Sequence, residues 1–340
     1  MNFCCRSLVF SLLIIPFWAA CAGGKTVRTA IVPPDPVEAS DLRSDGLKLD
    51  GFQAENSPTG DRLSGSRPII SRAETVFRAI AEAYPDRIGE IEFRDGDWTI
   101  RIFGELFYFA EGRLLPASLR DRVNEYNPLP FYNYQEELPP WEPPTPEESE
   151  RMKEQEQLRQ ARPSKRSSHF YDALWRTRDR DEAWEHIKQI RFLGHPIQVH
   201  YSILVSLSLV EETILRAAKT NLAVNQWVNS ISSIDAWNWR NIASAESRSY
   251  HAYGAAIDIL PKSLGGLETY WLWTAQHTPE WWTVPYSRRL HPPDEVIRAF
   301  ESFGFIWGGK WRYYDTMHFE YRPEILVLSG IPRKDYRDLR

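Results

Sequence analysis

The chain has few cysteines and no excess of positive charge. Its three cysteines, Cys4, Cys5 and Cys21, all lie at or before position 21 of 340 residues. The rest of the chain therefore has no disulfide available, and its stability must come from an apolar core, with or without a bound metal. A net charge of -5 and a pI near 6.0 give no basic field of the kind that binds phosphate backbones, so we expect no nucleic-acid partner.

Long apolar runs are also scarce, and the run near the N-terminus is short. Arg6 precedes the run from Leu8 to Trp18, and small residues follow it up to Gly23. Such a segment is too short to cross a bilayer comfortably, and it is typical of an export signal, which we predict for residues 1–22. We therefore expect an exported protein, periplasmic or associated with the cell envelope. The alternative is a cytosolic protein whose first helix is apolar.

Two further N-terminal features bear on location. Cys21 follows two alanines and resembles the lipid-attachment cysteine of bacterial lipoproteins, which would provide a membrane tether. Residues 23–70 are rich in Pro, Gly, Ser and Asp and lack periodicity, so we predict a flexible tether there. The sequence leaves open whether Cys21 is lipidated.

Periodic patterns begin after residue 70 and predict a small α+β accessory module over residues 71–126, the N-terminal module. Helical spacing covers 73–84, and short alternating runs at 91–93, 98–102 and 106–109 predict strands separated by glycine turns. We expect the aromatic faces of these strands to pack against the neighbouring domain.

Residues 127–165 form a predicted linker. Its first part is rich in proline and predicts a stiff extended connector, whereas 147–162 interleaves acids and bases and predicts a solvated helix. Beyond it we predict a domain over 166–330 with helices at 180–192 and 201–218 and strands at 196–200 and 234–239.

Two motifs in the C-terminal third carry chemistry. The first runs from Ser249 through His251 to Asp258, and the second runs from Asp315 through His318 to Glu320. Two histidines and a carboxylate can hold three positions around a zinc ion and leave a fourth open for water. Residues 256–260 and the alternating segment around His318 predict strands, and on the latter His318 and Glu320 would share a face. The sequence therefore predicts a metal-dependent hydrolase.

These motifs resemble those of the zinc D-alanyl-D-alanine carboxypeptidases and L-alanyl-D-glutamate endopeptidases of bacterial cell walls. The matching patterns are Ser-x-His-x-x-Gly-x-Ala-x-Asp at 249–258 and Asp-x-x-His-Phe-Glu at 315–320, within a resemblance that covers about 195–325. The resemblance implies one zinc ion per chain, an α+β fold with a small antiparallel sheet and flanking helices, and hydrolysis of peptidoglycan stem peptides. It implies these roles: His251, Asp258 and His318 as ligands, Asp315 as general base, and Arg240 in substrate binding.

The residues around these motifs agree with that implication but leave details open. An arginine near the zinc would pair with a peptide carboxylate, and Arg248 competes with Arg240 for this role. We assign Ser249 and Trp307 to substrate binding. We expect Glu320 to support a metal ligand and not to bind the metal itself. The sequence does not separate D,D- or L,D-carboxypeptidase from L-Ala-D-Glu endopeptidase activity.

Other interpretations remain. The same ligands make the facial triad of non-haem iron enzymes, although the chain lacks a close His-x-Asp pair. The domain can also be a non-catalytic cell-wall binding or scaffold module. A single buried histidine is more often a hydrogen-bonded core residue than a ligand, which we expect of the other six: His169, His186, His195, His200, His277 and His291.

Overall fold

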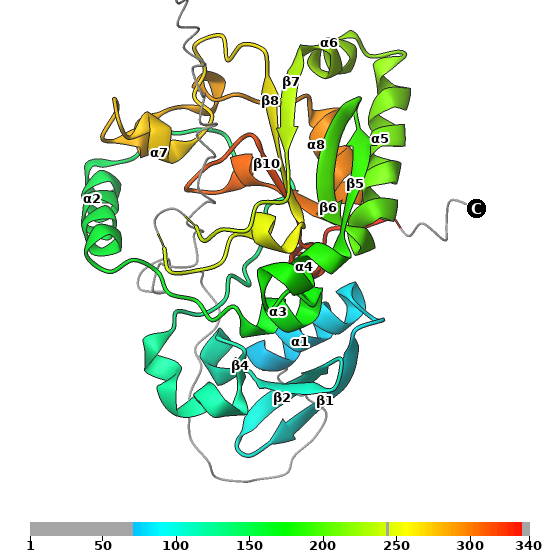
Figure 1. Cartoon of the computed structure of the whole chain (residues 1–340). Coiled ribbons are helices and arrows are strands. Elements are labelled where there is room, and N and C mark those ends of the chain that lie inside the picture. Colours follow the sequence, from blue (N-terminus) through cyan, green and yellow to red (C-terminus); the bar gives the residue numbers. More distant parts are fainter. Residues whose placement is uncertain (1–70, 243–244, 335–340) are drawn as a thin grey trace, which may run out of the picture. The chain divides into compact units, whose positions relative to one another are not determined.

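A four-stranded antiparallel sheet lies at the centre of the C-terminal part (Figure 1). The computed structural model describes residues 71–242 and 245–334. In this sheet, neighbouring strands follow the order β7, β8, β10, β9, so β8 lies beside a strand that comes much later in the chain. The strands are β7 (Ile231–Asp235), β8 (Ala256–Pro261), β9 (Phe305–Trp307) and β10 (His318–Tyr321).

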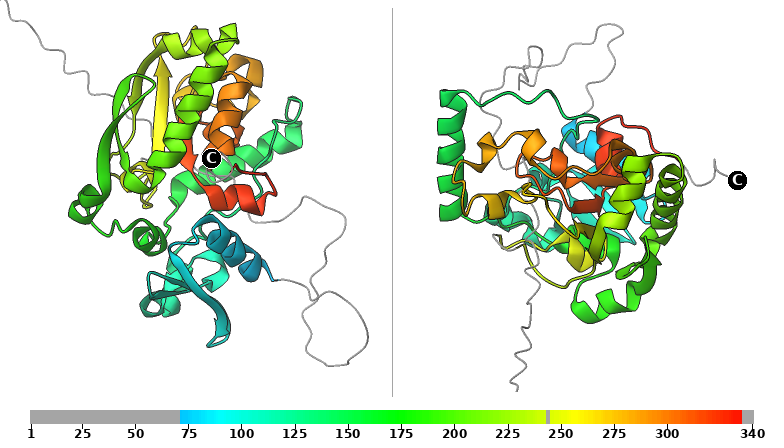
Figure 2. Two further views of the ribbon diagram at one scale, coloured as in Figure 1. Left: turned by 90° about the vertical axis from the view of Figure 1, so that its right-hand side faces the viewer. Right: turned by 90° about the horizontal axis from the view of Figure 1, so that it is seen from above.

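One face of this sheet is apolar and is covered by helices. Phe319 in β10 stacks on Phe300 of helix α8 (Asp294–Ser302), with ring centroids 4.0 Å apart. Helix α5 (Leu204–Ala218) lies beside α8 (Figures 1 and 2). Because consecutive strand residues point to opposite faces, His318 and Glu320 face away from these helices. The sheet thus separates a packed apolar side from a side that carries polar groups.

The helix predicted over 180–192 is wrong in its second half. Helix α4 (Arg180–His186) ends early, and β5 (Ile187–Phe192) pairs with β6 (His195–His200) in an antiparallel hairpin. The two loop residues, Leu193 and Gly194, both have positive φ, as a two-residue hairpin turn of type I′ requires. Pairing with β6 therefore overrides the helical pattern.

The strand predicted over 234–239 is also partly wrong. It begins earlier, after helix α6 (Leu222–Ser230), and ends at Asp235. Beyond this point the backbone leaves the sheet, because the Trp237 amide donates to Gln198 O in β6 at 2.9 Å.

The N-terminal module contains the helix and the strands that the periodicity predicted. Its sheet is a meander in the order β1, β2, β3, β4, with turns at Asp95-Gly96 and Phe103-Gly104 in which all four residues have positive φ. The Ser71 hydroxyl accepts from Glu74 N and caps the helix. The elements are α1 (Arg72–Ala83), β1 (Ile88–Arg94), β2 (Asp97–Ile102), β3 (Glu105–Tyr108) and β4 (Leu115–Pro116).

A single apolar cluster runs through the N-terminal module and the C-terminal sheet. It includes Phe77 of α1, Phe131 of the proline-rich segment, Phe319 of β10 and Leu326 of helix α9 (Pro323–Leu328). Helix α1 packs on α9. The described segment between 127 and 145 has no helix or strand, as predicted, yet Leu129, Phe131 and Tyr134 are buried in this shared core.

The charged helix α2 (Pro146–Ala161) is not solvated all around, contrary to the prediction. A capping box at Thr145 begins it, but Met152 is buried in an aromatic cluster with Trp271 and Trp281. The Arg159 guanidinium lies over the Trp271 ring at 4.8 Å. One methionine on a polar helix is too weak a periodic signal to predict this packing.

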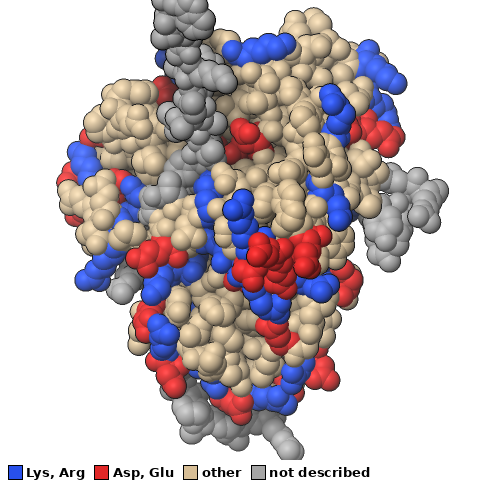
Figure 3. Space-filling view, viewed as in Figure 1, with Lys and Arg blue, Asp and Glu red and all other residues tan. Residues whose placement is uncertain are grey.

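The remaining helices are short, and charges are mixed on the surface. Among the described residues, no helix has the length and apolar character needed to cross a membrane. On the face in Figure 3, basic and acidic side chains are interspersed. Arg178 and the half-buried Glu182 form one ion pair of the described surface. The short helices are α3 (His169–Trp175) and α7 (Trp271–Thr274).

Candidate metal centre

His251 lies in a tight turn that its neighbours stabilise. The turn is a 3₁₀ helix, Tyr250–Tyr253, and the Ser249 hydroxyl accepts from His251 N at 3.2 Å. Gly254 ends it with φ of +67°, and a Cβ there would lie 2.5 Å from the Ile187 side chain. The fixed turn then leads directly into β8, which carries Asp258.

Asp258 and His318 are direct partners across β8 and β10. Paired residues in an antiparallel sheet point to the same face, so sheet register alone places these two side chains together. The ligand atoms of His251, Asp258 and His318 all lie within 4.8 Å of one another, and all three residues are buried. The structure thus brings together the three residues predicted to hold a metal.

The hydrogen bonds around the two imidazoles determine which nitrogen faces the centre. His251 Nδ1 lies 2.6 Å from Ala236 O, so it donates to that carbonyl and Nε2 carries the lone pair. His318 Nε2 lies 3.3 Å from Glu320 Oε2, so it donates outward and Nδ1 carries the lone pair. These two lone-pair nitrogens are 3.3 Å apart. Such an arrangement calls for a cation between them.

The distances fit a tetrahedral ion. Asp258 Oδ1 is 2.9 Å from His318 Nδ1, and Asp258 Oδ2 is 3.2 Å from His251 Nε2. Ligands about 2.0–2.1 Å from a tetrahedral zinc would be roughly 3.3 Å from one another. Asp258 Oδ2 is buried and accepts no hydrogen bond in the structure. A cation would satisfy that oxygen, so the residues fit a metal ion.

The charge of Asp258 is stabilised within this cluster. Burial raises the pKa of Asp258, but imidazoles that carry a proton towards it, His251 foremost, outweigh burial and hold that pKa below its usual range; a bound cation would take the place of those protons. Asp258 is therefore ionised at neutral pH and available as a ligand.

Asp315 is buried beside the centre but is not part of the three-residue cluster. It lies in the turn before β10, where its amide donates to Gly308 O at 3.0 Å and its carbonyl accepts from His318 N at 3.3 Å. These contacts fix Asp315 relative to His318. Its role as general base remains a prediction.

The residues predicted to bind substrate differ in their surroundings. Arg240 is half-buried, and its Nη1 donates to Asn241 O at 3.4 Å. Arg248, its competitor, forms an ion pair with Asp172 and also donates to Thr177 O. Arg248 is thus held within the fold, and the substrate-binding role of Arg240 stays a prediction.

Ser249 and Trp307 are both almost completely buried. The Ser249 hydroxyl is engaged by the turn that holds His251. The Trp307 indole donates to Thr316 O at 2.9 Å and supports the segment before β10. Both side chains thus stabilise segments that carry or precede a metal ligand. Their contact with substrate stays a prediction.

Sequence reasoning missed Asp235. It pairs directly with Asp258 across β7 and β8, so both carboxylates lie on the same face. Partial burial and the charge of Asp258 raise the pKa of Asp235, and His251 opposes this. The alternation along 231–235 was the available signal, but only the register with β8 shows that Asp235 faces the centre.

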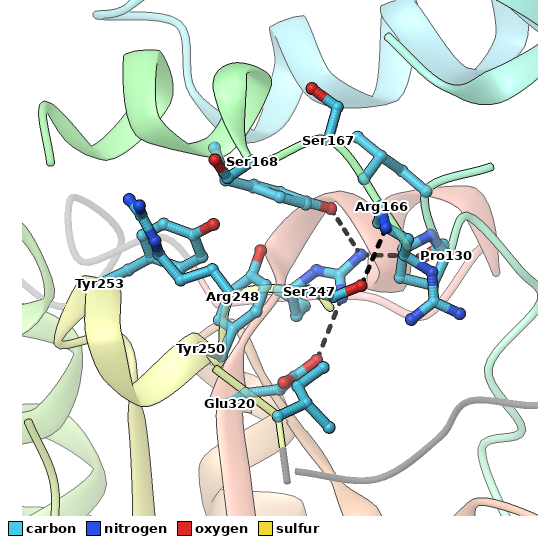
Figure 4. Close-up of a pocket in the computed structure, with 13 residues that line it drawn as sticks. Pro130, Arg166, Ser167, Ser168, Ser247, Arg248, Tyr250, Tyr253 and Glu320 are labelled. Carbon is cyan, nitrogen blue, oxygen red and sulfur yellow. Dashed lines mark hydrogen bonds and ion pairs between the residues drawn. The ribbon is translucent and has the colours of Figure 1, made fainter. Parts of the chain in front are cut away.

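Glu320 connects the centre to a buried arginine that the sequence did not single out. Its Oε1 accepts from Arg322 Nη1 at 3.0 Å, while its Oε2 faces His318. Glu320 also lines a cavity of about 50 Å³, with Ser167 and Ser168 on the opposite side (Figure 4). The contacts agree with a supporting role for Glu320, which stays a prediction.

Comparison with known proteins supports the resemblance in part. Residues 243–321 match the family model described as D-alanyl-D-alanine carboxypeptidase, and residues 76–131 match the model of a domain of unknown function. The first match is less than a quarter of the chain but includes all three clustered residues. No curated protein and no solved structure matches the chain. The matched region supports a peptidase with a metal site.

Proposed function

We propose that the chain is a zinc-dependent peptidase that hydrolyses peptide bonds in peptidoglycan stem peptides. The observation that carries the proposal is the convergence of one nitrogen from each of two imidazoles and a buried carboxylate oxygen without a hydrogen-bond partner, all within the region that matches the carboxypeptidase model. Two imidazoles and one carboxylate are a ligand set of catalytic zinc sites, which keep an open position.

The chain's residues divide the work as follows. His251, Asp258 and His318 would hold the zinc, which supplies an acidified water and polarises the substrate carbonyl. Asp315 takes a proton from the attacking water on its carboxylate and passes it to the departing amine nitrogen, a contribution of roughly a hundredfold to ten-thousandfold. Arg240 orients the substrate by pairing with a peptide carboxylate.

We also propose that the protein acts in the cell envelope. The apolar run ending before Cys21 and the tether over 23–70 support export, but they lie outside the described residues. Lipidation of Cys21 would hold the enzyme at a membrane, and the tether would let it reach the peptidoglycan. These features match the proposed substrate, which is found in the same compartment.

Mass spectrometry of muropeptides tests the proposal. Purified protein with measured metal content is incubated with peptidoglycan, and a chelator-treated sample is the control. Released D-alanine indicates a carboxypeptidase, and new amino termini indicate an endopeptidase. Sedimentation with peptidoglycan without cleavage by the zinc-loaded protein would instead identify a binding module, and stoichiometric iron would identify a non-haem iron protein.

A further inference from the structure

A continuous line of buried polar contacts joins the metal centre to the N-terminal module. His318 Nε2 faces Glu320, whose other oxygen accepts from Arg322 Nη1. Arg322 Nε donates to Glu324 Oε1 at 2.5 Å, and Glu324 Oε2 accepts from the Tyr84 hydroxyl at 2.8 Å. Tyr84 is the residue that ends α1. The line therefore extends from β10 through α9 to the first helix of the described chain.

These groups are shielded from water. Arg322 is 0% exposed, Glu324 1%, Tyr84 2% and Glu320 3%. Buried polar groups without partners are costly, so each member of the line depends on its neighbours for its orientation. A guanidinium has a rigid, planar set of donors, and a change at one of its contacts therefore shifts the others.

The region 76–131 supplies two contacts of this line. Besides Tyr84, it contributes Pro130, whose carbonyl accepts from Arg322 Nη2 at 2.9 Å. The same nitrogen donates to the Tyr171 hydroxyl at 3.0 Å. Both Tyr84 and Pro130 fall in the match to the domain of unknown function. This region thus contacts Arg322 and Glu324, and Arg322 in turn holds Glu320, the carboxylate beside His318.

The line also carries charge that bears on His318. Glu320 and Glu324 are two carboxylates around one guanidinium, which gives a net charge of -1 when all three are ionised. Burial lowers the pKa of Arg322. The nearby Tyr171 and Tyr250 and the carboxylates of Glu324 and Glu320 outweigh burial and hold that pKa well above its usual range. Burial, followed by the charge of Glu324, raises the pKa of Tyr84, which therefore remains a donor. A negative group beside His318 Nε2 favours the proton there and leaves Nδ1 for a metal.

We propose that the region 76–131 is a positioning part of the metal centre, in which Tyr84 fixes Glu320 through Glu324 and Arg322 and so sets the orientation and basicity of His318. The inference rests on the metal binding included in the proposed function. It assigns a role to a region that is otherwise matched only to a domain of unknown function. Tyr84 is a positioning residue, because it contacts neither metal nor substrate.

Zinc affinity of the full chain tests this inference. The dissociation constant is measured with zinc chloride and a chromophoric chelator as competitor, for wild type, Tyr84→Phe, Glu320→Gln and the double variant. Tyr108→Phe is the matched control, because Tyr108 also lies in the N-terminal module and donates to a carboxylate, Asp95, at 2.8 Å. Thermal unfolding of each metal-free variant measures the purely structural cost.

We expect Glu320→Gln to weaken zinc binding roughly 10- to 100-fold, the usual effect of removing such a support, and Tyr84→Phe to weaken it about 3- to 10-fold. Tyr108→Phe should leave affinity unchanged. Because Tyr84 acts through Glu320, the double variant should bind zinc no more weakly than Glu320→Gln alone. Fully additive losses, or a Tyr84→Phe affinity within error of wild type, would overturn the inference.

The outcome is separable from that of the proposed function. If the expected affinities are found but no muropeptide is cleaved, the positioning role stands and the peptidase fails. If peptides are cleaved in a zinc-dependent way while Tyr84→Phe keeps wild-type affinity, the peptidase stands and the positioning role fails.

Discussion

The two four-stranded sheets among the described residues are built in different ways. In the N-terminal module, strands that pair are consecutive in sequence, and short glycine turns join β1 to β2 and β2 to β3. In the C-terminal sheet, β8 pairs with β10 across a long connection, and that pair carries Asp258 and His318. The local sheet provides packing, whereas the sheet made of distant segments provides a site. Residues far apart in sequence can meet at one point only in the second kind.

Removing a metal ligand at the C-terminal sheet should have the largest effect on function. His251→Ala deletes one of three convergent ligands, and we expect it to abolish both stoichiometric metal binding and peptidase activity. Elemental analysis of purified protein and a muropeptide cleavage assay check this. Full activity in the variant would contradict the metal assignment.

Removing the proposed base should separate catalysis from metal binding at the same site. Asp315→Asn is nearly isosteric, so we expect the metal content to remain while kcat falls roughly a hundredfold to ten-thousandfold. Steady-state kinetics together with metal analysis measure the two effects. A normal kcat would exclude Asp315 as the proton acceptor.

A substitution in the core of the N-terminal module should act mainly on stability. Phe107 in β3 is buried against Phe170, with ring centroids 5.8 Å apart. Phe107→Ala should lower the free energy of unfolding by about 3–5 kcal/mol, as for other large buried aromatics. Urea unfolding measures this loss, and zinc affinity below the unfolding transition should stay near that of wild type. A large loss of affinity would mean that any damage to this region reaches the site, not only damage to the Tyr84 line.

The smallest expected effect is a pH dependence in the C-terminal part. Burial, with nearby positive charges, lowers the pKa of His200 to about 3. The unfolded chain, with a histidine pKa of about 6.5, then binds a proton that the folded chain excludes. His200 therefore favours folding above about pH 6.5, and this contribution is lost as pH falls toward 3, by up to about 1.4 kcal/mol per pH unit.

Urea unfolding at pH 7.5 and pH 5 checks the sign. His200→Gln should reduce the loss of stability between the two pH values. An unchanged loss would assign the acid sensitivity to other groups.

The two sheets also differ in how well the sequence predicts them. The helix and strands over 71–109 follow from periodicity and turn residues, since their partners are adjacent in sequence. The cluster of His251, Asp258 and His318 was predicted from motifs and a family resemblance, not from any local pattern. Asp235 and Arg322 were missed because their position depends on strand register and on partners more than 20 residues away.

The incorrect predictions of helices and of their packing also result from contacts between segments distant in sequence. Residues 187–192 carry helical spacing, but pairing with β6 outweighs this weak local preference. Met152 lies on a helix with little apolar character, and only the fold brings the Trp271 ring to it. Long-range contacts decided each of these cases.

The apolar cluster shared by α1, the proline-rich segment and α9 makes the described chain cooperative. A ligand that binds only the native state stabilises every part that unfolds with its site. Zinc added at the C-terminal sheet should therefore slow amide exchange in β2, a strand that contributes no ligand.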